Sequence, residues 1–142
     1  MESRRFGSEI VLRVDDGDEL LQAVESACRK HGVTSARVSG IGALSSVRLR
    51  VLNAENNGFI FRDFAEPMEI TSITGNITAD GDGLFLHLHL NAADGEMRIH
   101  GGHVMSCVIA NTAEIWITEL SDEILRRSET AEGLLRKIEF DT

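Results

Sequence analysis

The stretch "LFLHLHLN" (Leu84–Asn91) alternates apolar and polar side chains without a break. In an extended strand its four leucines share one face, while His87 and His89 share the other. The leucine face must be buried, so we predict a half-buried strand that presents two imidazoles on its outer face. Residues two apart on a strand are separated by about 6.6 Å, which lets both rings lean toward one metal ion.

Two further histidines, His100 and His103, follow in "IHGGH" after the dipeptide Asp94-Gly95. Asp-Gly favours a two-residue hairpin turn, and that turn pairs His89 with His100 across the hairpin. A β-bulge at Gly101-Gly102 would add one residue and bring His103 onto the same face. The sequence therefore predicts a cluster of three or four imidazoles on one face of a hairpin.

Three interpretations of this cluster are open: a metal site, an exposed polar face of the hairpin, or a metal-free acid–base cluster. Imidazoles without a neighbouring cysteine suit zinc, or else nickel, copper, iron or manganese. As the only ligands, His87, His89 and His103 would leave one coordination position open, as in catalytic zinc sites. His100 as a fourth ligand would close the site and indicate a structural role.

A carboxylate in "TAEIWITEL" (residues 112–120) is a second candidate. Strand alternation places Glu114 on the same face as Trp116. There it could be a general base or could orient a metal ligand, or it could lie on a solvated strand face.

The segment that precedes the hairpin begins with one strand and one helix. Residues 9–14 ("EIVLRV") are typical of a strand. The following "DDGDELLQAVESACRKHG" has an apolar stripe at helical spacing. Asp16 is the expected capping residue and Gly32 the expected left-handed stop.

After this helix, strand-like segments dominate up to residue 120, with a bulge or close backbone approach expected at Gly40 and Gly42. A shorter helix is expected from Ser121 to about Ala131, followed by a last strand, "LLRKIEF". The pattern predicts an α+β fold: a mainly antiparallel sheet packed against an N-terminal helix and a shorter later helix, in a single domain of residues 1–142.

Composition restricts the classes of partner. The chain carries a net charge of −9 and its bases are dispersed, which opposes attraction to DNA, RNA or an anionic membrane. No apolar stretch is long enough for a signal peptide or a membrane span. Cys28 and Cys107 lack CxxC spacing, so we expect two buried free thiols in a cytoplasmic protein.

In chain order, "SGIGALSSVRLRVLN", "SITGNI", "LFLHLHLN" and "IHGGHVMSCVIANTAEIWITEL" resemble the PPC domain, the plants-and-prokaryotes-conserved domain. The most specific parts are "SITGNI" and His-x-His followed by Gly-Gly-His. The resemblance implies an α/β-type domain that assembles as a homotrimer. It also implies a metal held by His87, His89 and His103, with His100 as an added neighbour. The spaced histidines are similar as well to acetolactate decarboxylase, which holds zinc with three histidines.

Two hypotheses follow. The first is a cytoplasmic, trimeric, zinc-binding protein that acts on or senses a small polar or anionic molecule; as an enzyme it would be a metal-dependent lyase or hydrolase, with Glu114 or His100 assisting proton transfer. The second is a DNA-binding or regulatory interaction module in which the metal is structural or absent. Plant PPC proteins carry an AT-hook, but no Arg-Gly-Arg-Pro hook occurs here, and with the negative charge this weighs against DNA.

Overall fold

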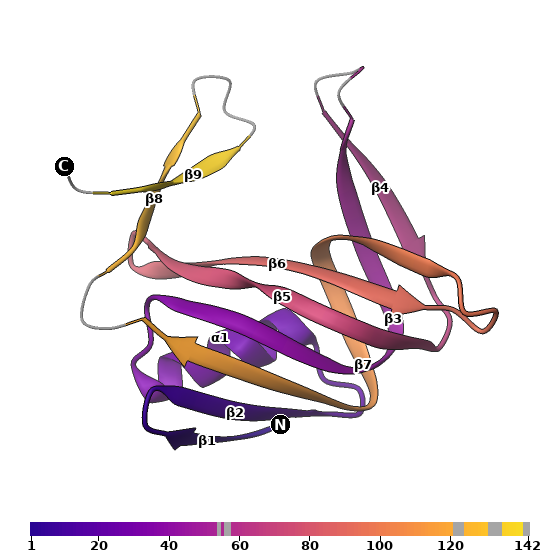
Figure 1. Ribbon diagram of the computed structural model, residues 1–142, viewed down its shortest axis with the longest axis horizontal. Helices are drawn as coiled ribbons and strands as arrows, with labels where there is room; N and C mark the ends of the chain where they lie inside the picture. The colour runs from indigo at the N-terminus through magenta and orange to yellow at the C-terminus, as the bar shows by residue number, and fades with distance from the viewer. Residues whose placement is uncertain (54, 56–57, 121–123, 131–134, 141–142) are drawn as a thin grey trace.

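Antiparallel strands make up most of the computed structural model, which describes residues 1–142 except 54, 56–57, 121–123, 131–134 and 141–142 (Figure 1). Among the described residues there is a single helix, so the predicted α+β class is confirmed in its main feature. The elements are β1 (Glu2–Phe6), β2 (Glu9–Asp15), α1 (Leu20–His31), β3 (Ala36–Asn53), β4 (Gly58–Phe64), β5 (Met68–Asp80), β6 (Gly83–Ala93), β7 (Ile99–Glu119), β8 (Arg126–Glu129) and β9 (Arg136–Glu139).

Seven strands form one sheet in the order β1-β2-β7-β6-β5-β3-β4, and β7 also pairs with β3. The ring β7-β6-β5-β3 therefore closes on itself. Closure is possible because the two longest strands have different partners along their lengths. The first half of β3 pairs with β5 and the second with β4, while β7 pairs with β6 at its start and with β2 at its end. One continuous strand thus connects the histidine hairpin to the core.

Helix α1 packs against β2, β6 and β7 through an apolar stripe. It ends at Gly32 in the left-handed conformation, as predicted. Its N-cap is Glu19 and not Asp16, because Oε2 of Glu19 accepts a hydrogen bond from the backbone N–H of Gln22 at 2.9 Å. Asp16 instead accepts a hydrogen bond from the N–H of Asn111 in β7. The buried stripe consists of Leu20, Ala23, Val24, Ala27 and Cys28.

The glycines of "SGIGAL" allow β3 to cross closely over β7. A side chain at Gly40 or Gly42 would lie within 3 Å of β7 backbone atoms, at Glu114 and Ala113 respectively. The pairing of β3 with β5 also shifts its register between these two glycines. The predicted bulge and close backbone approach are both confirmed.

The shorter later helix is not seen in the described part of the chain, and that prediction was wrong over residues 126–129. These residues form strand β8, which pairs with β9; residues 121–123 and 131 lie outside the described residues. The physical reason is a tertiary contact. The guanidinium of Arg127 donates hydrogen bonds to Asn76 and Thr78 on β5, and such contacts override a local helical preference.

Both cysteines, Cys28 and Cys107, are buried free thiols, as predicted. Burial raises the pKa of each thiol to about 12, so neither is a reactive thiolate at neutral pH. In the part of the chain that the structure describes, no helix has the length and apolar character needed to cross a membrane.

Gly75 of "SITGNI" should be intolerant of a side chain, because a Cβ there would overlap the carbonyl oxygen of His87 on β6. We expect Gly75→Ala to lower the free energy of unfolding by about 1–3 kcal/mol, the range typical of overpacking. Urea denaturation would measure this change. Gly83→Ala is the matched control, since its Cβ would make only an ordinary 3.4 Å contact; equal losses in the two variants would contradict the prediction.

Candidate metal centre

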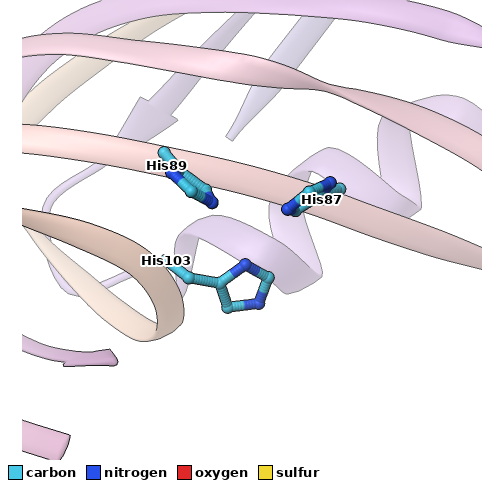
Figure 2. Close-up of side chains that lie close together, drawn as sticks. All are labelled: His87, His89 and His103. Atoms are coloured by element: carbon cyan, nitrogen blue, oxygen red, sulfur yellow. The ribbon is translucent and has the colours of Figure 1, made fainter. Parts of the chain in front are cut away.

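Three histidines from two neighbouring strands converge on the outer face of the sheet (Figure 2). His87 and His89 project from β6, and His103 projects from β7 directly opposite His89. One ring nitrogen of each residue lies within 4.8 Å of those of the other two. The ring centroids are 5.1–5.4 Å apart. The three residues (hereafter the histidine triad) are the only such cluster of possible ligands among the described residues.

The register that creates the triad differs from the predicted one. Ala93 pairs with Ile99, so the hairpin loop has five residues (94–98) instead of the two of an Asp-Gly turn. Relative to the predicted pairing, β7 is displaced by an odd number of residues, which exchanges its two faces. His103 therefore reaches the triad through regular pairing, and the bulge predicted at Gly101-Gly102 is absent from the β6–β7 ladder.

The five-residue loop is organised by the buried carboxylate of Asp94. Its Oδ1 accepts hydrogen bonds from the backbone N–H groups of Glu96 at 2.9 Å and Arg98 at 3.0 Å. Its Oδ2 accepts from the Arg98 side chain and lies 3.0 Å from Nε2 of His100. These contacts add the residues that shift the register, so Asp94 determines which face each histidine occupies.

His100 lies on the opposite face of β7 from the triad. Besides its contact with Asp94, its ring packs 4.7 Å from the ring of Phe64. The predicted pairing of His100 with His89 was wrong, because His100 pairs with Ala92. The structure thus leaves three imidazoles, and not four, in the cluster.

The two glycines of "IHGGH" have a packing role. A Cβ at Gly101 would overlap the side chain of Asn91 on β6, and one at Gly102 would lie 2.8 Å from the carbonyl oxygen of Arg50 on β3. Glycine is therefore required where β7 passes between β6 and β3. The Gly-Gly-His motif brings β7 close enough to place its histidine beside β6.

Burial and positive charge keep two members of the triad, His87 and His103, neutral. Burial, the charge of Arg50 and the neighbouring imidazoles lower the pKa of His103 to about 4. Burial, followed by the charge of Arg127, lowers the pKa of His87 below its ordinary value. Neutral imidazole is the form that coordinates a metal ion. At neutral pH, protons therefore compete only weakly with a metal ion for the imidazoles of His87 and His103.

Arginines missed by the sequence reasoning border the triad. Arg50 on β3 pairs with His103 in the β-ladder. An Nη2 of Arg127 on β8 lies 3.4 Å from Nδ1 of His87. No sequence signal marked Arg127, because its segment was expected to be helical. Residues of β3 and β8 line a pocket of about 170 Å³ beside the triad. The pocket is lined by Arg50, Phe85, His87, His103, Arg127, Glu129, Leu135 and Arg136.

Glu114 is not brought to the triad. It is an exposed residue in the second half of β7, where its ladder partners are Arg13 on β2 and Ile41 on β3. It lines a different depression, together with Glu69 and Thr71. Neither of the two candidate proton-transfer residues, Glu114 and His100, lines the triad's pocket.

Residues 1–121 match the Plants and Prokaryotes Conserved (PCC) domain. The chain belongs to this family. It is 32% identical over 127 residues to the bifunctional protein GlmU of a Synechococcus strain, a match that covers 87% of this chain and 19% of GlmU. The chain thus spans about a fifth of the length of the curated relatives it matches.

Solved structures share the PCC fold. A metal-containing protein from Archaeoglobus fulgidus superposes with a TM-score of 0.85 at 27% identity, with 96% of each chain covered. A proposed DNA-binding protein from Bacteroides thetaiotaomicron gives 0.91 at 24% identity, with 98% of this chain and 96% of the other covered. The expected distant similarity to acetolactate decarboxylase is found in the Bacillus subtilis enzyme, with a TM-score of 0.57 at 17% identity over 86% of this chain and 57% of the enzyme; it is a likeness of fold.

The charge of Asp94 should contribute to stability in a pH-dependent way. Hydrogen bonds from the side chain of His100, from the backbone and side chain of Arg98 and from the backbone of Glu96 hold the pKa of Asp94 well below its ordinary value. A depressed folded-state pKa gives stability that is fully present above the unfolded value, about 3.9, and is lost as the pH falls below it. We therefore expect Asp94→Asn to lower the urea midpoint at neutral pH, and the difference from wild type to shrink as the pH falls below about 4.

Glu96→Gln, in the same loop, removes an exposed carboxylate and is the control for a general charge effect. An Asp94→Asn difference that stays constant across the pH range would show that the charge of Asp94 is unimportant.

Proposed function

We propose that His87, His89 and His103 hold one divalent transition-metal ion, with zinc preferred. The observation that carries the proposal is the convergence of three ring nitrogens within 4.8 Å. Two nitrogens that share one zinc ion can be at most about 4.2 Å apart, since each bond is about 2.0–2.1 Å long. A small rotation of the rings meets this limit. The metal-containing relative from Archaeoglobus fulgidus supports the proposal.

Three ligands leave a coordination position for a further molecule, as in catalytic zinc sites. When bound, the ion would supply a Lewis acid for a carbonyl group or for water. We therefore propose that the protein acts on or senses a small polar or anionic molecule at this position, in the cytoplasm. The buried free thiols support a reducing compartment. Proton transfer by Glu114 or His100 stays a prediction, and a partner copy would have to bring either residue to the triad.

Homotrimeric assembly, which the family resemblance implies, is part of the same proposal. Large apolar side chains of the projecting β3–β4 hairpin are about half exposed, which supports burial against another copy. They are Val51, Leu52, Ile60 and Phe61. We expect sedimentation equilibrium to give a mass three times the 15.6 kDa of one chain. A mass of one chain at micromolar concentration would contradict the assembly.

Duplex DNA is the alternative partner. The net charge of −9 opposes it, and the similarity to the proposed DNA-binding protein is one of fold. A salt-dependent affinity for duplex DNA, undiminished when the triad is substituted, would favour this alternative over a small-molecule site.

Removal of one triad histidine should abolish tight metal binding. In protein prepared without a histidine tag, we expect zinc at one equivalent per chain by elemental analysis. His103→Ala should raise the dissociation constant by more than about 100-fold, because loss of an outer hydrogen-bond partner alone changes metal affinity by about 10–100-fold. Isothermal titration calorimetry with zinc measures both the number of zinc ions bound per chain and the dissociation constant.

The matched control is His100→Ala. This substitution removes an imidazole from the same strand but from the opposite face. The backbone N–H groups of Glu96 and Arg98 still bind Asp94 and keep the register, so the zinc affinity should be unchanged. Negligible metal in the wild-type protein, or equal losses in the two variants, would refute the proposed site.

A further inference from the structure

We infer that the ligand of the proposed metal site is a small oxyanion, a carboxylate or a phosphate, held jointly by the metal, Arg50 and Arg127. This inference rests on the proposed function and adds the chemical class of its ligand. It follows from the charge around the triad, from the way the two guanidinium groups are held, and from the size of the pocket.

The positive charge at the proposed metal site is not balanced by an ion pair with a carboxylate of the described residues. All three triad ligands are neutral when they coordinate a metal, so a divalent ion keeps its full charge. Arg50 and Arg127 add two positive charges. Among the described residues, no carboxylate forms an ion pair with either of them, although the chain has an excess of acids. An anion at the open position would compensate this charge.

Arg127 is held in place before any ligand arrives. Its Nε donates to Thr78 Oγ1 at 3.1 Å, its Nη1 to the carbonyl oxygen of Arg136 at 2.9 Å, and its Nη2 to Asn76 Oδ1 at 2.6 Å. Its guanidinium carbon lies 5.0 Å from the ring centre of Phe85. Because these contacts fix the side chain, ligand binding costs less conformational entropy. All three partners accept hydrogen bonds from Arg127, so its positive charge stays uncompensated.

Arg50 approaches the triad from the other side. It pairs with His103 across the β3–β7 ladder, which places both side chains on one face. Its guanidinium lies 4.1 Å from the ring centre of Phe59. The triad is thus bordered by one arginine from β3 and one from β8. The planar fork of a guanidinium matches carboxylate and phosphate oxygens better than it matches a halide or a neutral ligand.

The size of the pocket and the remaining charges favour a small anion. The volume of about 170 Å³ equals that of about five or six water molecules at roughly 30 Å³ each. Glu129 also lines the pocket, but it pairs with Arg136 at 3.4 Å, and Arg136 pairs with Asp80 as well. These three side chains together carry one negative charge, which disfavours a larger anion that would extend from the positive arginines beside the triad toward Glu129.

The test uses the protein loaded with cobalt(II), whose visible absorption reports a change of coordination. Inorganic phosphate, acetate and glycolate are titrated separately, and the two kinds of anion thereby distinguish a phosphate ligand from a carboxylate ligand. We expect at least one of them to saturate one site and to change the spectrum. Arg50→Gln and Arg127→Gln should each raise its dissociation constant at least about 10-fold, the effect of a charged hydrogen bond.

Arg48→Gln is the control, because it removes the same charge two residues from Arg50, where the arginine pairs with Asp63 at 3.7 Å. It should change the dissociation constant of the anion by less than about 2-fold, because Arg48 does not line the pocket and its charge is already paired with that of Asp63 at the surface. Arg127 also holds β8 to β5 through Thr78 and Asn76, so its substitution disturbs the fold as well as the charge. The guanidinium of Arg50 makes no hydrogen bond to the described residues, so Arg50→Gln is the decisive variant.

The outcomes separate the two proposals. If cobalt binds to the triad but no anion changes the spectrum, or if Arg50→Gln and Arg48→Gln weaken the anion equally, the oxyanion inference is wrong and the metal site stands. If the wild-type protein binds no metal, both are wrong. Anion binding that depends on Arg50 and not on Arg48, with unchanged metal content, supports the inference.

Discussion

The register between β6 and β7 is the constraint on which the site depends. An odd displacement of one antiparallel strand exchanges its faces, so only one class of pairing puts His103 beside His89. The carboxylate of Asp94 specifies that pairing, because it accepts the loop N–H groups that a two-residue turn would not contain. The buried carboxylate, and not a bulge in the glycines, thus selects the histidine that joins the triad.

The closed ring of strands makes that register rigid. β7 is held by β6 at its start, by β3 along most of its length and by β2 at its end. Glu19 adds a further connection, since its Oε2 caps α1 and its Oε1 accepts from the N–H of Cys107 in β7 at 2.9 Å. Displacement of the histidine hairpin would therefore require changes in the helix and in both neighbouring strands.

Strand alternation alone predicted much of this site. The leucines of "LFLHLHLN" had to face the core, which placed His87 and His89 together, and the family motif added His103. Sequence reasoning failed where a tertiary contact decides the outcome. The residues around Arg127 were expected to be helical because nothing local shows that the side chain binds Asn76 and Thr78 on β5.

The prediction of the hairpin turn failed for a related reason. Asp-Gly is a strong local signal for a two-residue hairpin, but it does not show that the same aspartate also binds His100, six residues later. The arginines of the site were missed because their neighbours come from strands far apart in the sequence. Features that follow from strand alternation were thus predicted correctly, whereas long-range side-chain contacts were not predicted.

The alternation of β6 also separates the chemistry of this protein from its folding. Leu88 and Leu90 are buried in the core. His87 and His89, which alternate with them along the strand, project from its other face (Figure 2). A substitution on the outer face leaves the packed face untouched. A chain with this scaffold can therefore gain, lose or exchange a metal centre during evolution through a few surface substitutions, without first having to repack its interior.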